Sequence, residues 1–176
     1  MNRDKQIILR PGKLSDVPLL CYWDEKPHVI ASGAADEDWD WEKELAHDPV
    51  WREQLMSELD GRPIGFVQII DPLLEETHYW GEVPPHLRAI DIWIGEEEDL
   101  GKGYGSEMMR QAFGRCFAPP EVEAILIDPL TRNTAAHRFY ERLGFVFVEN
   151  RDFYGDDCKV YRLSRKDWLK AAASSK

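Results

Sequence analysis

The stretch that decides the fold reads AIDIWI at residues 89–94 and, after a short acidic connector, LGKGYG at residues 100–105. The apolar first part predicts a strand, and the residues after 105 return to helical periodicity. Three glycines at alternate positions let the backbone turn tightly and bring its N–H groups against an anion. The positive end of the helix dipole adds to that attraction. A strand, a glycine turn and a helix in this order predict a pyrophosphate-binding site.

Composition limits the class of protein. The chain has 176 residues, of which 43% are hydrophobic and 31% are charged. These values predict a single domain over residues 1–176, with 165–176 as a loosely ordered tail. The net charge is -11 and the pI is about 4.9, so the overall field repels nucleic acid and anionic lipid. We therefore expect a cationic small molecule as the partner, and neither nucleic acid nor a membrane.

The cysteines and the N-terminal residues indicate the compartment, and the histidines bear on metal binding. The three cysteines are an odd number without CxxC spacing, which fits buried thiols in a reducing environment. The N-terminal residues lack the apolar core of a signal peptide. The five histidines show no metal-ligand spacing, so we expect no metal. We expect a cytoplasmic protein that is a monomer or a homodimer.

Strand and helix signals alternate along the chain, with no repeat and no low-complexity linker. The clearest hairpin joins two strands through Asp60-Gly61, a pair that is typical of tight turns. The elements predicted in the first half are a strand at 6–10, a helix from Ser15-Asp16 to Trp23, an acidic helix at 36–46, strands at 51–59 and 63–70, an exposed loop at 71–85 and a central strand at 87–95.

The second half continues the alternation. Apolar residues recur at helical spacing after the glycine segment, until Pro119-Pro120 ends the helix. The unbroken apolar run at 123–128 predicts a central strand covered on both faces. The elements predicted after it are a helix at 133–143 capped by Gly144, and strands at 145–148 and 159–163 joined through an acidic turn at 156–157. A mixed α/β fold follows.

The glycine segment has other interpretations. A P-loop requires Gly-Lys followed by Ser or Thr, whereas Lys102 is followed by Gly103, so a nucleoside triphosphatase is disfavoured. A dinucleotide-binding fold places its glycines after the first strand, whereas these glycines follow roughly the fourth. Taken alone, the segment also fits a simple tight turn at the start of a helix.

A second group of motifs lies downstream, with DP at 128–129, NTAA at 133–136 and RFYERLGF at 138–145. Together with the glycine segment, these motifs resemble the GNAT superfamily of N-acetyltransferases. The resemblance covers most of the chain and implies a GNAT-type mixed, partly splayed central sheet of about six or seven strands, flanked by about four helices. It also implies acetyl-CoA as the co-substrate. Leu100 departs from the pattern, because the family usually has Gln or Arg there.

The resemblance also assigns roles to residues. In that family the glycine loop binds the coenzyme A pyrophosphate, an asparagine on the downstream helix lies near the pantetheine, and a tyrosine lies near the thioester sulfur. The matching positions are Gly103 with Gly105, Asn133 and Tyr140. The full set of cofactor-binding residues implied in this way is Ile92, Trp93, Ile94, Gly101, Lys102, Gly103, Tyr104, Gly105, Ser106, Asn133, Ala136, Arg138 and Tyr140.

Within the superfamily, YWGE at 79–82, RAID at 88–91 and IDP at 127–129 are most similar to the aminoglycoside 6'-N-acetyltransferases. Those enzymes acetylate an amino group of a polycationic antibiotic, and acidic residues at the positions of Asp91 and Asp128 contact the acceptor. Acyltransferases that modify hydroxylated lysine in siderophore synthesis share much of the pattern. The substrate-binding residues expected here are Trp39, Trp41, Trp80, Glu82, Asp91 and Asp128.

Acyl transfer to an amine sets chemical requirements of its own. An alkyl amine with a pKa of about 10 is protonated at neutral pH, so a carboxylate or a water chain must take a proton before the nitrogen attacks. Asp91 is the predicted base. Tyr140 is the predicted acid, because a phenol that faces the cleft can protonate the departing thiolate. No covalent enzyme intermediate is required, which fits the lack of an obvious activated nucleophile.

Several of these residues also have simpler structural interpretations. The acidic run at 96–99 is expected to be a solvated connector, and the tryptophans of the 36–41 segment either line an acceptor site or pack inward. Asp128 either binds the acceptor or ends its strand, Asn133 either binds the co-substrate or caps its helix, and Tyr140 either acts in the site or packs in the core. An acetyltransferase for another amine, such as a polyamine or a peptide, and a coenzyme A-binding module without turnover remain alternatives.

Overall fold

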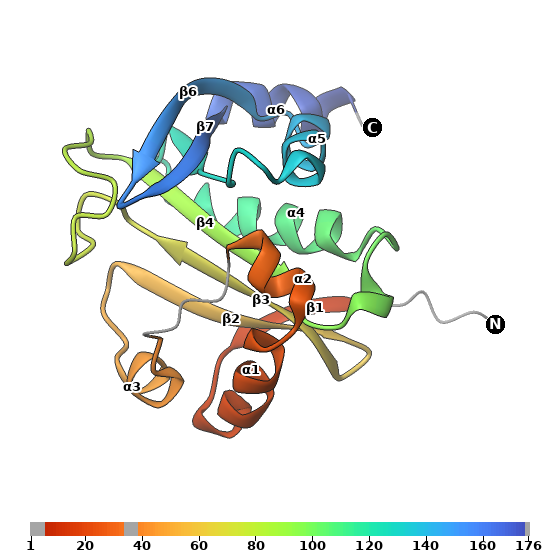
Figure 1. The fold of residues 1–176 in the computed structure, drawn as a ribbon. Helices are drawn as coiled ribbons and strands as arrows, with labels where there is room; N and C mark the ends of the chain where they lie inside the picture. The colour runs from red at the N-terminus through yellow and green to blue at the C-terminus, as the bar shows by residue number, and fades with distance from the viewer. Residues whose placement is uncertain (1–5, 34–38, 175–176) are drawn as a thin grey trace. The chain divides into compact units, whose positions relative to one another are not determined.

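The computed structural model describes residues 6–33 and 39–174, which form seven strands and six α-helices (Figure 1). The strands are β1 (Ile7–Pro11), β2 (Arg52–Leu59), β3 (Arg62–Ile70), β4 (Leu87–Ile94), β5 (Ala124–Ile127), β6 (Val146–Phe153) and β7 (Asp156–Ser164). The helices are α1 (Val17–Asp24), α2 (Pro27–Ser32), α3 (Trp41–Ala46), α4 (Tyr104–Cys116), α5 (Thr134–Arg142) and α6 (Arg165–Ser174), with short 3₁₀ turns η1 (Leu14–Asp16) and η2 (Glu97–Asp99).

All seven strands belong to one mixed sheet in the order β1-β2-β3-β4-β5-β7-β6. β4 and β5 are parallel, whereas β1 with β2, β5 with β7, and β6 with β7 are antiparallel. The parallel pairing joins Leu87–Ala89 to Ala124–Leu126, although β4 continues to Ile94. The seven-stranded mixed sheet confirms the predicted mixed α/β fold.

The chain divides into two compact units, residues 1–69 with 91–112 and residues 70–90 with 113–176. In the first unit the Asp-Gly hairpin is confirmed, since Asp60 and Gly61 have φ angles of 51° and 83° between β2 and β3. Positive φ at both turn residues matches the twist of the flanking strands. The core of this unit is a cluster of buried apolar side chains, namely Leu20, Trp23, Val29, Trp41, Met56, Phe66 and Trp93.

Gly95, directly after β4, is required by close packing. A Cβ atom at this position would lie 2.0 Å from the Trp23 ring, which is fully buried. The indole Nε1 of Trp23 donates to Glu96 over 3.1 Å, so the glycine and the carboxylate together seat the ring. The end of β4 is thereby fixed against α1 before the glycine loop begins.

The helices of the first unit differ from the sequence prediction in three ways. α2 was not predicted, although it has Pro27 in its first turn and Gly33 at its C-cap with a φ of 80°. The predicted acidic helix at 36–46 begins only at Trp41, where Asp40 accepts a cap hydrogen bond from Lys43, and residues 34–38 lie outside the described ranges. Asp16 occupies the predicted N-cap position of α1, but its side chain makes no cap hydrogen bond and instead binds the Arg10 guanidinium.

In the second unit, β6 and β7 form a long antiparallel hairpin (Figure 1). Its turn is made by Tyr154 and Gly155, with φ angles of 55° and 100°. The predicted acidic turn at 156–157 is therefore wrong, because Asp156 and Asp157 already belong to β7 and pair with β6. Both strands are longer than predicted, because the polar stretch at 149–153 continues β6.

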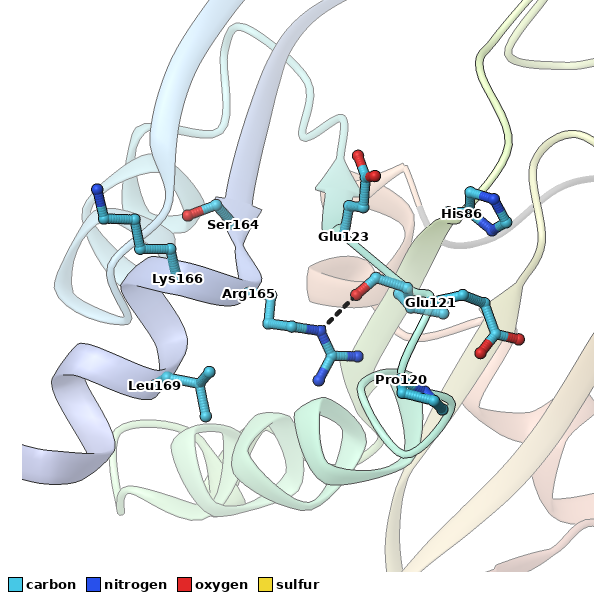
Figure 2. A pocket seen from close by; sticks show the side chains of 9 residues that line it. His86, Pro120, Glu121, Glu123, Ser164, Arg165, Lys166 and Leu169 are labelled. Carbon is cyan, nitrogen blue, oxygen red and sulfur yellow. Dashed lines mark hydrogen bonds between the residues drawn. The ribbon is translucent and has the colours of Figure 1, made fainter.

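Within the tail predicted at 165–176, residues Arg165–Ser174 form α6, and residues 175–176 lie outside the described ranges. Arg165 anchors it by donating to the carbonyls of Phe117, Pro119 and Val122 over 2.7–3.0 Å, and Figure 2 shows this side chain at the wall of an open pocket of about 730 Å³. The Ser164 hydroxyl oxygen accepts a hydrogen bond from the backbone N–H of Asp167, and serine is a residue that commonly caps the start of a helix in this way. No helix within residues 6–33 and 39–174 has the length and apolarity to cross a bilayer.

Candidate active site

The glycine loop has the backbone that its sequence predicts. Gly101 and Gly103 have φ angles of 70° and 82°, a region that costs other residues about 1–2 kcal/mol. A Cβ atom at either position would meet nothing within 4 Å, so glycine is favoured there by the backbone conformation and not by a lack of room for a side chain. Both are exposed, and the 13-residue helix α4 begins directly after them at Tyr104. Its first N–H groups have no acceptor within the helix, so the loop can hold an anion such as a pyrophosphate.

The residues next to the loop decide how it is held. The buried Asp99 carboxylate accepts two hydrogen bonds from Arg62, over 2.8 and 3.0 Å, and these raise the pKa of Arg62. The Lys102 ammonium lies 3.8 Å from the same carboxylate. Asp99 therefore fixes the loop to the start of β3 and positions the one lysine that the loop carries.

The acidic run before the loop was expected to be a solvated connector, and this is wrong for half of it. Glu96 pairs with Lys26 over 3.0 Å and accepts from Trp23, while Asp99 is buried. Only Glu97 and Glu98 are exposed. Two of the four charges are thus neutralised by nearby cations, which reduces their repulsion of an anionic ligand.

Asp91 lies in the second half of β4 with its side chain open to solvent. The Gln68 amide of β3 donates to its Oδ2 over 3.0 Å. Burial by the surrounding protein raises the pKa of Asp91, and the hydrogen bond from Gln68 opposes this rise. A raised pKa makes this carboxylate a stronger base than an aspartate with the ordinary pKa.

The predicted residues beside Asp91 lie in different surroundings. Trp93 is 9% exposed and packs on Phe66 with ring centroids 4.7 Å apart. Ile92 and Ile94 are half-buried, and the Ile94 carbonyl oxygen is 2.9 Å from His28 Nε2. Any contact of these three residues with a ligand stays a prediction.

The two tryptophans at 39 and 41 show the inward packing that was one of their alternatives. Trp41 is 3% exposed, its ring lies 5.1 Å from that of Phe66, and its indole donates to Asp24. Trp39 is half-buried with its ring 5.5 Å from Trp41. Trp41 thus has little surface for a substrate, whereas Trp39 keeps some, and direct contact by either residue stays a prediction.

In the second unit, Asp128 directly follows β5 and is half-buried. The Tyr79 hydroxyl donates to its Oδ2 over 2.6 Å. The Tyr79 ring stacks on Phe153 with centroids 4.7 Å apart and planes inclined by 9°. Asp128 is therefore held by a phenol whose ring is itself fixed, and its contact with an acceptor stays a prediction.

Tyr79 belongs to the predicted long loop, and Glu75 organises that loop. The buried Glu75 carboxylate accepts from the backbone N–H groups of Thr77 and Tyr79 and from the Thr77 hydroxyl, over 2.7–2.9 Å. Trp80 is 4% exposed, whereas Glu82 is exposed. A cavity of about 230 Å³ beside this loop is lined by His78, Tyr79, Trp80, Gly81, Arg151, Asp152, Phe153 and Tyr154.

Helix α5 carries the remaining predicted residues. Asn133 caps it by accepting from the Ala136 N–H over 3.2 Å, which leaves the side-chain NH₂ group to donate to a ligand. Arg138 is exposed and Ala136 half-buried. Tyr140 is 8% exposed, with its ring 5.1 Å from that of Phe139.

The structure thus places Asp91, Trp93 and the glycine loop in one unit, and Asp128, Trp80 and α5 in the other. Sequence reasoning missed Gln68, Tyr79 and Glu75. The signal for Gln68 was available, because it is a carboxamide within the apolar strand FVQII and a buried polar group needs a partner. Within the described ranges, no group of three His, Cys, Asp or Glu side chains could hold a metal ion.

Comparison with known proteins identifies the family of this chain. Residues 13–153 match the model of the acetyltransferase (GNAT) domain. The aminoglycoside N(6')-acetyltransferase type 1 of Klebsiella pneumoniae is 28% identical over 152 residues, which cover 82% of this chain and 76% of that protein. Lysine N-acyltransferase MbtK of Mycobacterium tuberculosis is 24% identical over 168 residues, which cover 88% of this chain and 76% of that protein.

A solved structure adds the three-dimensional comparison. Aminoglycoside acetyltransferase AAC(6')-Ib, crystallised in complex with coenzyme A and kanamycin, superposes with a TM-score of 0.84 at 25% identity. The superposition covers 95% of this chain and 99% of that one. A family match over most of the chain, with a mixed seven-stranded sheet and a glycine loop at the start of α4, shows that this chain belongs to the GNAT acetyltransferase family.

Proposed function

We propose that this GNAT acetyltransferase, which takes its acetyl group from acetyl-CoA, transfers that group directly to a primary amine of a polycationic acceptor, foremost an aminoglycoside. The observation that carries the proposal is Asp91, a solvent-accessible carboxylate whose pKa is raised by burial and which is held by Gln68. Such a carboxylate attracts an ammonium group and is a better proton acceptor than an aspartate with the ordinary pKa.

The glycine loop supports the donor side of the proposal. Backbone N–H groups at Gly101, Gly103 and the start of α4 would hold the pyrophosphate, with Lys102 nearby as the cation. Leu100 has no polar side chain to add, so the main chain and Lys102 carry this contact. Acetyl-CoA supplies an activated thioester whose carbonyl carbon accepts the amine nitrogen.

Asp91 and Tyr140 account for the proton transfers. Asp91 would take a proton from the acceptor ammonium, so that the nitrogen lone pair becomes free to attack the thioester. Tyr140 would give its phenolic proton to the sulfur as the carbon–sulfur bond breaks. The tight packing of the Tyr140 ring against Phe139 limits its rotation, which suits a group that must present one oxygen in a fixed place.

Asp128 is proposed to bind a second amino group of the acceptor. Its Oδ2 accepts a hydrogen bond from the Tyr79 hydroxyl, which orients the carboxylate. Trp80 and Glu82 belong to the same loop and are proposed to contribute, Trp80 by shape and Glu82 by charge. A net charge of -11 favours a polycation over an anionic or neutral acceptor.

A second acceptor class has its own supporting observation. The similarity to lysine N-acyltransferase MbtK extends over 168 residues, and a hydroxylated lysine side chain is also an amine. Such an acceptor carries one amino group near the reacting atom and few others. It would therefore need Asp91 but gain little from Asp128.

The proposal also includes a cytoplasmic location and a role in antibiotic resistance. Cys21, Cys116 and Cys158 form no disulfide, which suits a reducing compartment. Cys116 and Cys158 are buried as predicted, whereas Cys21 is exposed, so the prediction of buried thiols is wrong for Cys21. Expression in a susceptible bacterium should raise the aminoglycoside concentration needed to stop growth, and a Tyr140→Phe variant should raise it less.

The decisive experiment measures thiol release from acetyl-CoA with a panel of amines. Release that depends on an aminoglycoside supports the leading proposal, and release only with a hydroxylated lysine, a polyamine or a peptide supports the second class. Binding of coenzyme A by calorimetry without release for any amine would contradict catalysis. Mass spectrometry of the product gives the acetylated position.

A further inference from the structure

We infer that Gln54 and Gln68 form a hydrogen-bonded relay across β2, β3 and β4 that positions Asp91 and assigns its Oδ1 atom as the one that takes the proton. The inference rests on the proposed function, because it concerns how Asp91 acts as a base. Gln54 Nε2 donates to Gln68 Oε1 over 3.2 Å, and Gln68 Nε2 donates to Asp91 Oδ2 over 3.0 Å. Gln54 and Gln68 are positioning residues.

The chemistry of the three groups fixes the direction of the relay. An ionised Asp91 has only acceptor atoms, so Gln68 must turn its NH₂ group toward it. The Gln68 carbonyl oxygen then faces β2, and only the NH₂ group of Gln54 can satisfy it. Reversal of either carboxamide would place two acceptors or two donors against each other.

The surroundings make the relay rigid. Gln68 is 8% exposed within a strand whose neighbours on either side are buried. The Gln54 backbone carbonyl accepts from Gly12 over 2.8 Å, and Gln54 is half-buried. A buried carboxamide that keeps both partners has no favourable alternative rotamer, because each alternative loses a hydrogen bond.

The relay has a direct consequence for the proton. Gln68 takes one lone pair of Asp91 Oδ2, whereas Oδ1 keeps both of its lone pairs and is therefore the atom that we assign to the acceptor ammonium. When the ammonium loses its proton, a new O–H bond forms at Oδ1 and the charge of the carboxylate disappears. Oδ2 is then a carbonyl oxygen that still accepts from Gln68, so the relay needs no rearrangement during the step.

The relay also affects the ionisation of Asp91. The groups presented by β2 and β3 are the two neutral carboxamides, and the causes acting on the Asp91 pKa are burial, which raises it, and the Gln68 hydrogen bond, which lowers it. No charged side chain of the described residues is among these causes. Loss of the donor should therefore move the acid limb of the pH–rate profile upward.

Three variants test this with the full-length enzyme, acetyl-CoA and the most active amine of the panel. The measurement is the acid limb of kcat/KM against pH. Gln68→Leu should move the limb up by about 1 pH unit, equivalent to about 1.4 kcal/mol. Gln68→Glu should move it further, since a second carboxylate opposes ionisation. Gln54→Leu should move it by less, since Gln68 keeps its amide but loses its orientation.

Two controls separate this relay from general damage. Gln111→Leu removes a carboxamide of the same unit that donates to the Ile7 carbonyl over 2.7 Å, and it should leave the limb unchanged. In an Asp91→Asn background, Gln68→Leu should have no further effect on the profile. Carbon-13 NMR titration of the Asp91 carboxyl, assigned by comparison with Asp91→Asn, gives the same shift without turnover if a variant is inactive.

The outcomes are distinguishable from failure of the proposed function. If Asp91→Asn removes the acid limb but Gln68→Leu leaves it in place, the relay is overturned and the base is kept. If Asp91→Asn leaves the limb and the rate unchanged, Asp91 is not the base and both proposals fail. If Gln68→Leu does not fold, Gln54→Leu tests the relay instead, because Gln54 is only half-buried. An unchanged acid limb of kcat/KM in that variant overturns the relay.

Discussion

Asp91 and Asp128 are both carboxylates that accept a hydrogen bond from a neutral donor of their own unit, but they are held in different ways. Asp91 lies within β4 and is reached by Gln68 from the adjacent strand, 3.0 Å away. Asp128 follows β5 and is reached by Tyr79, 2.6 Å away, from the loop between β3 and β4. One support is the sheet itself, and the other is a loop.

This difference in support fits two different roles, proton transfer for Asp91 and acceptor recognition for Asp128. A group held by neighbouring strands keeps its position closely, as a proton transfer requires. A group held by a loop can vary between related enzymes without disturbing the sheet, as recognition of different acceptors requires. We therefore expect changes at Asp91 to lower kcat and changes around Asp128 to raise KM.

The largest effect is expected for Asp91→Asn. The amide keeps the size of the side chain but cannot accept the proton, so kcat/KM should fall by about 10²–10⁴. Steady-state thiol release over a range of pH measures the loss, and the acid limb should disappear with it. Binding of coenzyme A by calorimetry is the control and should be unchanged. A decrease of less than threefold in kcat/KM would contradict the assignment of Asp91, where threefold corresponds to only about 0.6 kcal/mol.

Asp128→Asn is expected to rank second and to differ in kind. Loss of a charge that pairs with an acceptor ammonium should raise KM about 10-fold to 100-fold, while kcat changes little. The comparison becomes sharper with a second acceptor, because an amine with a single amino group should show almost no change in KM. An equal fall in kcat for both acceptors would show that the two aspartates do not divide the work.

Much of the fold could be predicted from local patterns. Asp60-Gly61, the apolar run at β5 and the glycines before α4 each require one conformation whatever surrounds them, and all three are confirmed. The predicted turn at Asp156-Asp157 failed because turn composition alone does not set the register of a hairpin. Tyr154-Gly155 makes the turn instead, with a tyrosine at positive φ.

The site was predictable in part for a physical reason. Asp91 attracts notice because a charge within an apolar strand needs a task or a partner. Gln68 carries the same signal more weakly, since a neutral amide costs less to bury. Glu96 and Asp99 were misread as solvated, because their partners Lys26 and Arg62 come from elements distant in sequence. Pairings of that kind follow from tertiary packing, which a linear pattern does not contain.

Tyr79→Phe should have a smaller effect than loss of Asp128 itself. The ring would keep its stack on Phe153, and the hydrogen bond to Asp128 would be lost. A released carboxylate is less well oriented, so KM for a polycationic acceptor should rise about 2-fold to 10-fold with kcat unchanged. Tyr161→Phe is the matched control, because it removes a phenol that donates to Glu141 in the same unit. A fall in kcat would assign Tyr79 to the chemical step instead.

The smallest effect is expected at Glu75, which supports Tyr79. Burial alone raises the pKa of Glu75, but hydrogen bonds from the Tyr79 and Thr77 N–H groups and the Thr77 hydroxyl outweigh it, so the pKa lies below its usual value. A folded-state pKa below the unfolded one stabilises the protein at higher pH and is lost as pH falls through the folded value. Glu75→Gln should therefore lower the free energy of unfolding by about 1 kcal/mol at neutral pH.

Urea unfolding at neutral pH and in steps toward acid measures this stabilisation directly. The difference between the wild-type protein and Glu75→Gln should shrink as pH falls through the folded pKa of Glu75, because protonation removes the charge that accepts the three hydrogen bonds. Glu121→Gln, at an exposed carboxylate of the same unit, should show no such difference at any pH. A Glu75→Gln difference that stays constant with pH would mean that shape, and not charge, holds the loop. The loop would then hold Tyr79, and through it Asp128, equally well in acid and at neutral pH.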